Sequence, residues 1–541
     1  MASLKLPFMP TMLAAVGGGL LAAKTTSLTT SSAMFWAFSV VIPFYVLYSS
    51  WIYPMYISPL RKVPTVSGFP LWGQFFDIIN NEVGVPQRKW HAEHGQIVRY
   101  FFPFGAERLS IAQDDAIKQI TVRNPYNYPK PLRAKLWMVR ILGEGVLLAE
   151  GDTHVRQRKA LAPGFSISSI RTLTPIFWQK ALLLAELWKE EMVAEKVRSK
   201  SFEVLEWLNR TTLDIIGSAG LGTEIDSLRN PDAPLREAYR LVFAFDVMSR
   251  VFHGLAAFIP VTKYLPAKMN RDMQMSRDII LNKAADIISE KTEFAKSSNG
   301  HKGKDIISLI IKDNLKATGE NSLSFEESRD QVMTFLGAGH DTTATSVAWT
   351  LHLISKYPEV QAKLRAEIKE HMPFLFDEDK RTKSEYLDKA DADRLPYLDN
   401  VCKETLRYIP AIPMTVRQNV LPDKLGDYEI PAGTTVYILA QVINRMPDYW
   451  GPTADNFDPD RWENLPPTYT QNAFMTFLQG PRGCIGRKFA EVEMKLLLCS
   501  LLSMYSFESD PSVDDPEQWK MWRLVLRPKD GVSLIAKPLD P

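Results

Sequence analysis

The chain has 541 residues, of which 45% are hydrophobic and 23% charged, the proportions of an ordinary globular protein. Its net charge of +2 gives no global sign of a nucleic-acid partner. The three cysteines, Cys402, Cys484 and Cys499, exclude a disulfide scaffold and cannot complete a four-cysteine zinc or iron–sulfur site. This count still allows one thiol with a chemical role.

The N-terminal part predicts a membrane anchor, residues 1–57. Its main span, residues 33–53, is uncharged over about 21 positions, which is long enough to cross the hydrocarbon core. A buried core helix is the alternative interpretation. Aromatic residues stand near both ends of the span, as interfacial anchors do: Phe35, Trp36, Trp51, Tyr53 and Tyr56.

A second apolar stretch, residues 6–23, precedes this span and is rich in glycine. Two interpretations stay open for it: a second membrane span, or the hydrophobic region of a cleaved signal. Arg61 and Lys62 follow the main span and favour a cytosolic body by the positive-inside rule, while Lys5 and Lys24 weaken that bias.

Residues 58–73 predict a stiff, turn-rich hinge, because they contain Pro64, Gly68, Pro70 and Gly73. Residues 74–541 predict one body without a long linker or an internal repeat. The apolar periodicity is mostly helical, and shorter β-like runs such as residues 434–439 (TTVYIL) interrupt it. The expected fold class is therefore mainly α with small β-sheets, preceded by a transmembrane helix.

One long helix is predicted in the second half of the chain. Ser324 and Glu327 form a capping-box pattern at its start. The apolar periodicity continues to Lys356, before Tyr357 and Pro358 end it. This helix would have about 33 residues and a length of roughly 50 Å, enough to cross a whole domain.

The middle of this helix contradicts local helix preference. Gly337 and Gly339 each weaken a helix by roughly 1 kcal/mol relative to alanine. Two explanations stay open, a functional site or helix packing that needs small residues. Asp341 and Thr342 favour the first, because an acid and a hydroxyl beside a locally loosened turn could deliver protons.

The segment around Cys484 carries the most specific pattern, with Phe477, Gly480, Arg482, Cys484 and Gly486 at fixed spacing. Glycines let a backbone wrap closely around a metal-bound sulfur, so that amide groups can hydrogen-bond to it. An apolar helix begins after Gly486, and its N-terminal dipole favours a thiolate. The pattern resembles the haem-binding signature of the cytochrome P450 family.

Two further stretches resemble the same family, in the family's order. Glu404 and Arg407 resemble its ExxR pair, and Arg461 stands in a segment similar to its PxR-F/W motif. These three residues would form a partly buried charge network that holds the cysteine loop. ExxR alone is unspecific, since the chain repeats it at Glu195/Arg198, Glu237/Arg240, Glu326/Arg329 and Glu378/Arg381.

The resemblance also implies which residues bind the cofactor, a haem b whose iron takes Cys484 as its axial ligand. Residues 338–343 resemble the family's oxygen-activation stretch, in which Asp341 and Thr342 would be catalytic. His154 and Arg158 stand where the family commonly has Trp-x-x-x-Arg, so His154 departs from its pattern. The residues implied to bind haem are His154, Arg158, Ala338, Arg417, Phe477, Arg482, Cys484 and Gly486.

The resemblance implies a haem-thiolate monooxygenase that oxidises an apolar small molecule, in the style of fungal members that act in secondary metabolism. A fatty-acid or other lipid hydroxylase is the alternative substrate class. Two other classes stay open: a reductase-independent haem-thiolate isomerase or dehydratase, and a non-catalytic haem-sensing or membrane protein. Family members of the isomerase class usually lack the acid–threonine pair, so Asp341 and Thr342 argue against it.

No Gly-x-Gly-x-x-Gly fingerprint follows a predicted strand, so we expect no flavin domain in this sequence. The resemblance then implies electrons from NADPH through an external membrane-bound reductase. A basic face with Arg156, Lys159, Arg487 and Lys488 is the hypothesis for its docking site. The expected partners are this reductase, an apolar substrate and the lipid bilayer, without nucleic acid. The expected location is the endoplasmic reticulum membrane, with the catalytic body in the cytosol.

Overall fold

A computed structural model describes residues 6–69, 71–243, 268–297, 303–316, 322–387, 392–518, 520–522 and 524–539. Pro70 of the predicted hinge and Lys5 lie outside the described residues. The chain divides into two compact units. Unit 1 comprises Met1–Pro131 and Met414–Ile443, and unit 2 comprises Leu132–Pro413 and Asn444–Pro541. The boundaries of anchor, hinge and body drawn from the sequence remain predictions.

Unit 1 combines N-terminal helices with a small sheet. Its main elements are α1 (Phe8–Thr25), α2 (Thr30–Leu47), α3 (Phe75–Ile79), α4 (Val85–His94), β1 (Ile97–Phe102), β2 (Ala106–Ile111), α5 (Asp114–Lys118), β4 (Thr415–Gln418), β5 (Asp423–Leu425), β6 (Tyr428–Ile430), β7 (Thr435–Ile438) and α18 (Ala440–Ile443).

The larger sheet of unit 1 has four strands in the order β1-β2-β7-β4, and β5 and β6 form a separate antiparallel pair. β1 and β4 pair antiparallel with their neighbours, whereas β2 and β7 run parallel. β7 confirms the strand predicted over residues 434–439. Val98 and Tyr100 alternate along β1 and point to the same face, where they pack with Trp90 of α4 in a buried cluster.

The predicted anchor is helical. Among the described residues one helical stretch, Thr30–Ile57, is long and apolar enough to cross a membrane, and only 6% of its most apolar window is buried. It consists of α2 and a π-helical continuation, η1 (Tyr48–Ile57), with Pro43 and Pro54 inside. The expected N-terminal helix is thus present, with bounds slightly wider than residues 33–53.

The end of the anchor and the predicted hinge are fastened to the sheet. Arg99 of β1 donates to the Pro54 carbonyl oxygen at 3.0 Å and to Glu107 Oε1 at 3.0 Å. Ser58 Oγ donates to the same carboxylate at 2.6 Å. Because Arg99 and Glu107 are buried, this pair fixes residues 54–58 against β1 and β2.

Unit 2 is mainly helical. Its main elements are α6 (Leu132–Leu142), α7 (Gly151–Leu161), α8 (Ile167–Glu195), β3 (Lys200–Glu203), α9 (Val204–Ile215), α10 (Pro234–Phe243), α12 (Lys268–Lys296), α13 (Ile306–Lys316), α14 (Phe325–Lys356), α15 (Pro358–His371), α16 (Ser384–Leu387), α17 (Pro396–Tyr408), α19 (Pro447–Trp450), α20 (Arg487–Met504), β8 (Tyr505–Ser509), β9 (Lys520–Trp522), β10 (Leu526–Pro528) and β11 (Ser533–Pro538).

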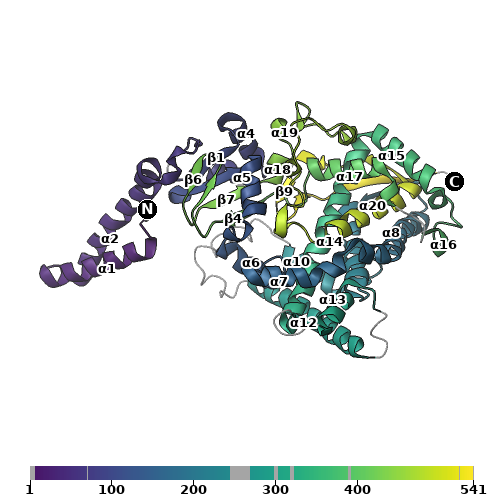
Figure 1. Cartoon of the computed structure of the whole chain (residues 1–541), viewed down its shortest axis with the longest axis horizontal. Coiled ribbons are helices and arrows are strands. Elements are labelled where there is room, and N and C mark those ends of the chain that lie inside the picture. Colours follow the sequence, from purple (N-terminus) through teal and green to yellow (C-terminus); the bar gives the residue numbers. More distant parts are fainter. Residues whose placement is uncertain are drawn as a thin grey trace. The chain divides into compact units, whose positions relative to one another are not determined.

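The strands of unit 2 form two small sheets, β3-β11-β8 and β9-β10, beside the helices (Figure 1). The expected class, mainly α with small sheets, is confirmed. α14 and α20 pack against each other and against α9 and α8, respectively. Trp178, Trp188 and Trp349 are fully buried, and the Trp188 ring stacks on Phe202 at 4.5 Å. Such apolar burial is the main stabilising contribution of the unit.

α14 confirms the predicted long helix. Ser324 and Glu327 make both hydrogen bonds of the capping box, and Tyr357 ends the helix. The helix is regular through Gly337 and Gly339, so no turn is loosened, contrary to expectation.

The two glycines of α14 have packing roles. A Cβ at position 337 would lie 2.3 Å from Leu142 Cδ2, and one at position 339 would lie 3.2 Å from Ile216. Helix packing that needs small residues, the alternative left open by the sequence, therefore explains Gly337 and Gly339.

Candidate active site

The predicted ligand Cys484 lies in a tight loop in front of α20. Its N–H donates to the Phe477 carbonyl oxygen at 2.9 Å, which closes the loop. Gly480 has φ +70°, a conformation that favours glycine. Leu478 also has a positive φ, of 57°, so the loop holds one residue in a strained conformation. Cys484 is exposed as a residue, so a ligand can reach its side chain, although protein atoms crowd the sulfur on one side.

The surroundings of this thiol exert opposing effects on its charge. Burial by surrounding protein atoms raises the pKa of Cys484 above its usual value, and this is the largest effect. The Gly486 backbone, which hydrogen-bonds to the sulfur, and the nearby Arg158 and Arg487 lower that pKa. An exposed cysteine, an amide donor and nearby cations are the groups that a metal-bound thiolate needs. They fit the implied haem.

Two arginines implied to bind the haem carboxylates adjoin this loop. Arg158 of α7 donates from Nη1 to the Gly483 carbonyl oxygen at 2.5 Å. Arg482 forms an ion pair with Glu150 and donates from Nη1 to the Ala149 carbonyl oxygen at 3.1 Å. Arg158 thus joins the cysteine loop to the last turn of α7, and Arg482 joins it to the residues just before α7. Their binding to haem remains a prediction.

The other implied haem contacts lie in different elements. His154 is buried in α7, one helical turn before Arg158. Arg417 is buried in β4 of unit 1 and Ala338 lies in α14 of unit 2. Phe477 begins the cysteine loop, with the Arg487 guanidinium 5.2 Å from its ring centre. The roles of these residues remain predictions.

Asp341 has a partner that the sequence did not suggest. Its carboxylate forms an ion pair with Arg527 of β10. Asp341 is 3% exposed and Arg527 21%, so the pair joins a buried acid to a side chain near the surface. Thr342 Oγ1 donates to the Ala338 carbonyl oxygen at 2.9 Å, an ordinary bond within a helix.

Arg527 also lines a polar surface cavity of about 180 Å³. Most of the other lining residues are charged or polar: Glu203, Glu206, Asn209 and Lys529, with Leu205, Pro528 and Gly531. A cavity of this size holds several water molecules. Solvent therefore reaches the cation that holds Asp341.

The predicted charge network is fully assembled. Arg407 donates to both oxygens of Glu404 at 2.8 Å, and both side chains are completely buried. Arg461 Nε donates to Glu404 Oε1 at 3.3 Å. The carboxylate also accepts from the Asp458 N–H at 2.9 Å and from Trp462 Nε1 at 3.0 Å. A buried carboxylate with this many donors is well compensated for its lost hydration.

This network continues toward the cysteine loop. Arg407 Nη1 donates to the Asn444 carbonyl oxygen at 2.9 Å. The Asn444 side chain accepts from the Met475 N–H at 2.8 Å and donates to Thr476 Oγ1 at 2.8 Å. Thr476 immediately precedes Phe477, so the network fixes the start of the loop.

Glu493 of α20 is a buried acid that sequence reasoning missed. Its side chain is completely buried, and burial raises its pKa well above the usual range. Neither carboxyl oxygen of Glu493 has a hydrogen-bond partner among the described residues. Glu491, Glu493 and Lys495 all stand in the otherwise apolar stretch of residues 489–504, so the sequence did not single out Glu493. Glu493 is therefore a buried acid whose lost hydration no hydrogen bond in the described structure replaces.

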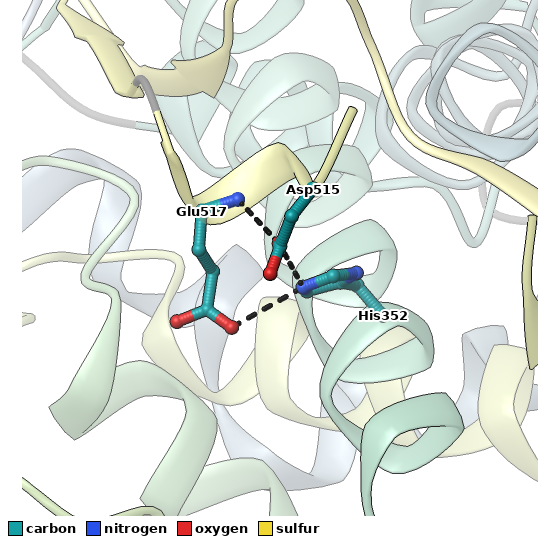
Figure 2. Close-up of side chains that lie close together, drawn as sticks. All are labelled: His352, Asp515 and Glu517. Atoms are coloured by element: carbon teal, nitrogen blue, oxygen red, sulfur yellow. Dashed lines mark hydrogen bonds and ion pairs between the residues drawn. The ribbon is translucent and has the colours of Figure 1, made fainter. Parts of the chain in front are cut away.

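A second cluster of titratable groups lies at the end of α14. His352 Nε2 lies 3.3 Å from Glu517 Oε1 and 3.4 Å from Asp515 Oδ1 (Figure 2). This geometry could hold a metal ion. However, Lys356 Nζ already lies 3.0 Å from Asp515 Oδ2 and 2.7 Å from Glu517 Oε1. We interpret the cluster as ion pairs that hold residues 515–517 to α14.

The four residues of the predicted basic face differ in their contacts. Arg156 pairs with Glu327, and Lys488 contacts Asp393 at 2.8 Å. Lys159 and Arg487 are exposed, although Arg487 contacts Glu491 at 2.7 Å. Lys159 and Arg487 are therefore the side chains best placed to meet a partner.

The two remaining cysteines are buried in helices, as the sequence predicted. Cys402 lies in α17 and Cys499 in α20. Burial raises the pKa of both thiols, so they remain neutral packing residues.

Comparison with known proteins is consistent with this geometry. The family model described as Cytochrome P450 matches residues 63–535. Cytochrome P450 monooxygenase sphH of Aspergillus fumigatus is 32% identical over 509 residues, covering 91% of each chain. Cytochrome P450 monooxygenase FUM15 of Gibberella moniliformis is 32% identical over 558 residues, covering 93% of this chain and 92% of that protein. Cytochrome P450 monooxygenase 205 of Postia placenta is 33% identical over 507 residues, covering 87% and 90%.

Proposed function

The chain belongs to the cytochrome P450 family, and on that premise we propose that Cys484 is the axial haem ligand of a membrane-anchored monooxygenase. Membership makes the protein a haem-thiolate monooxygenase. The observation that supports Cys484 is its exposed position, where the sulfur has the Gly486 amide as a hydrogen-bond donor. Cys402 and Cys499 are buried and have no such setting.

Bound haem with a thiolate ligand supplies dioxygen activation, because the thiolate pushes electron density onto the iron and favours O–O cleavage. The protein's part is to hold this ligand ionised and oriented. The Gly486 amide hydrogen-bonds to the sulfur, while Arg158 and Arg487 favour its charge. Arg158, Arg417 and Arg482 would pair with the haem carboxylates, and His154 would donate a hydrogen bond there.

Asp341 and Thr342 would deliver the protons that oxygen activation consumes. Arg527 pairs with the Asp341 carboxylate, and the surface cavity that Arg527 lines admits water. Asp341 can then accept a proton from the solvent side and pass it toward Thr342. The Thr342 hydroxyl donates to Ala338 and keeps its oxygen lone pairs available to a water molecule.

Electrons would come from NADPH through an external membrane-bound reductase. Lys159 and Arg487 are exposed cations suited to an acidic partner surface. Changing both to glutamate should slow haem reduction, with an effect that shrinks at high salt. Lys369→Glu and Lys383→Glu, exposed cations that do not belong to this face, form the matched control. Unchanged reduction rates in the first variant would refute this docking site.

The substrate would be an apolar small molecule, an intermediate of secondary-metabolite biosynthesis. The resemblance of the chain to fungal members supports this class. Thr30–Ile57 would anchor the enzyme in the endoplasmic reticulum membrane, with the body in the cytosol. Screening compounds for a substrate-induced spin-state shift of the haem would identify the class directly.

The decisive test measures the ligand and the reaction separately. The reduced carbon-monoxide spectrum should show thiolate-bound haem in the parent enzyme and lose it in Cys484→Ser. Cys402→Ser is the matched control and should keep the spectrum. With added reductase, NADPH consumption should yield an oxygenated product. A thiolate spectrum that persists in Cys484→Ser would falsify the ligand assignment, and product formation without NADPH would point to an isomerase or dehydratase.

A further inference from the structure

α1 and α2 form a helical hairpin in unit 1. The connection, residues 26–29, is short, so the two helices must run antiparallel. Phe8 and Tyr45 are in edge-to-face contact at 5.5 Å at the open end. Near the turn, a Cβ at Gly19 would lie 2.6 Å from the Met34 sulfur and 3.2 Å from its Cα. The helices therefore touch along their whole length.

Small residues permit this close approach. Ala15 and Gly19 of α1 and Ala33 of α2 are buried between the helices. Membrane helices pair through small residues in this way, because lipid provides no hydrophobic force between them. Water-facing polar groups at the turn are also bonded within the hairpin: Thr26 Oγ1 donates to the Ala22 carbonyl oxygen at 2.7 Å.

The outer surface of the hairpin is apolar on both helices. Each of the following side chains is more than two-fifths exposed: Met9, Leu13, Leu20 and Leu21 on α1, and Phe35, Trp36, Val40 and Phe44 on α2. In water such a surface would be unfavourable on both helices alike. α1 has 18 residues, or about 27 Å, somewhat less than the roughly 30 Å of the hydrocarbon core. Unlike Thr30–Ile57 it is not long and apolar enough by itself, so its insertion would depend on its packing against α2.

Charge separates the two ends of the hairpin. In the sequence Lys5 precedes α1, and Arg61 and Lys62 follow the anchor, so these three cations stand before the first helix and after the second. Lys24 is the only charged residue of α1 and lies beside the turn, from where a lysine can extend to the membrane surface. By the positive-inside rule the open end faces the cytosol.

We propose that α1 and α2 both cross the bilayer, so that the segment before α1 and the catalytic body lie on the same cytosolic side. The turn at residues 26–29 then lies on the lumenal side. This inference rests on the proposed anchoring by Thr30–Ile57 and extends it to a two-pass hairpin. A single-pass anchor would instead leave the apolar face of α1 in the lumen.

Glycosylation of the full chain in endoplasmic reticulum microsomes tests this topology. One chain carries an N-terminal tag with an Asn-Ser-Thr acceptor ahead of Met1, and another carries a spacer with the same acceptor between Ser27 and Leu28. We expect the turn acceptor to be glycosylated. The N-terminal acceptor should stay unmodified, and protease added outside the vesicles should remove the tag. Glycosylation of the N-terminal tag, or an unmodified turn acceptor, would overturn the proposal.

Two controls separate this result from the membrane anchoring itself. Deleting residues 8–29 while keeping the tag should move the tag across the membrane, so that it becomes glycosylated. The body carries its own acceptor at Asn209, with Thr211, which should remain unmodified if the body is cytosolic. Release of the full chain by alkaline carbonate would refute the anchoring, whereas retention with a glycosylated N-terminal tag would refute only the two-pass hairpin.

Discussion

Asp341 in the middle of α14 and Arg527 in β10 form an ion pair although 186 residues separate them. The pair is one of several links between α14 and the C-terminal strands and the segment before them. Trp349 Nε1 donates to the Leu526 carbonyl oxygen at 3.0 Å, and Lys356 contacts Asp515 and Glu517. The C-terminal hairpin thus holds the acid that we assign to proton delivery.

Arg527→Gln should impair the coupling of NADPH use to product. Asp341 would lose its cation while it stays buried, so its carboxylate would be poorly positioned. We expect a several-fold lower ratio of product to NADPH, more peroxide, and a loss of unfolding free energy of about 2 kcal/mol. Arg527→Lys should restore part of the ratio. The control Lys529→Gln removes a cation from the same cavity and should change neither quantity.

Product ratio and stability distinguish two roles for Arg527. If Arg527→Gln lowers the melting temperature but keeps the ratio of product to NADPH, the arginine is structural only. A changed solvent isotope effect on product formation, absent in Lys529→Gln, would support proton delivery through Asp341.

Arg407→Lys should abolish stable haem binding. Arg407 makes two bonds to Glu404 and three to backbone carbonyl oxygens, a geometry that a lysine cannot reproduce. The free energy of unfolding should fall by about 3–5 kcal/mol, because the buried Glu404 carboxylate is left partly uncompensated. The haem content of the purified variant measures the predicted loss of haem binding. Arg240→Lys is the matched control, since Glu237 and Arg240 form an exposed ExxR pair, and it should be neutral.

Glu493→Gln should stabilise the protein increasingly as pH rises from 5 to 8. Burial raises the pKa of Glu493 in the folded state, so the unfolded chain releases this proton at a lower pH. Folding stability therefore falls as pH rises above the usual glutamate pKa, and glutamine removes that decline. The melting temperature across this range measures the effect, expected to be a few degrees. Glu491→Gln, on the more exposed side of α20, should leave the pH slope unchanged.

Glu517→Gln should weaken the attachment of the segment at residues 515–517. Burial alone would raise the pKa of Glu517, but its bonds to His352 and Lys356 outweigh burial and hold it at about 2. This contribution is complete above the usual glutamate pKa and is lost as pH falls toward 2. At pH 7 we expect a loss of about 1–2 kcal/mol in unfolding free energy.

The same cluster gives a test of metal binding. Because Lys356 occupies the space between Asp515 and Glu517, added zinc should not raise the melting temperature of the parent enzyme. A marked zinc-dependent rise that disappears in Glu517→Gln would instead identify a metal site.

Local properties of the sequence predicted several elements correctly. The capping box and periodicity gave α14 its ends, alternating residues predicted β7, and an uncharged run predicted the apolar helix at Thr30–Ile57. The spacing around Cys484 identified the loop, because glycine conformations and helix starts depend on neighbouring residues. These features act over a few positions, so a single sequence contains them.

Only the tertiary structure decided which distant groups meet. Five ExxR copies look alike in sequence, yet Glu404 and Arg407 are fully buried while Glu237 and Arg240 are exposed. Gly337 and Gly339 suggested a loosened turn, but Leu142 and Ile216 pack into the space they leave. The partner of Asp341 and the burial of Glu493 likewise depend on chain topology. Ion pairing and packing are set by three-dimensional neighbours, which local sequence preference does not encode.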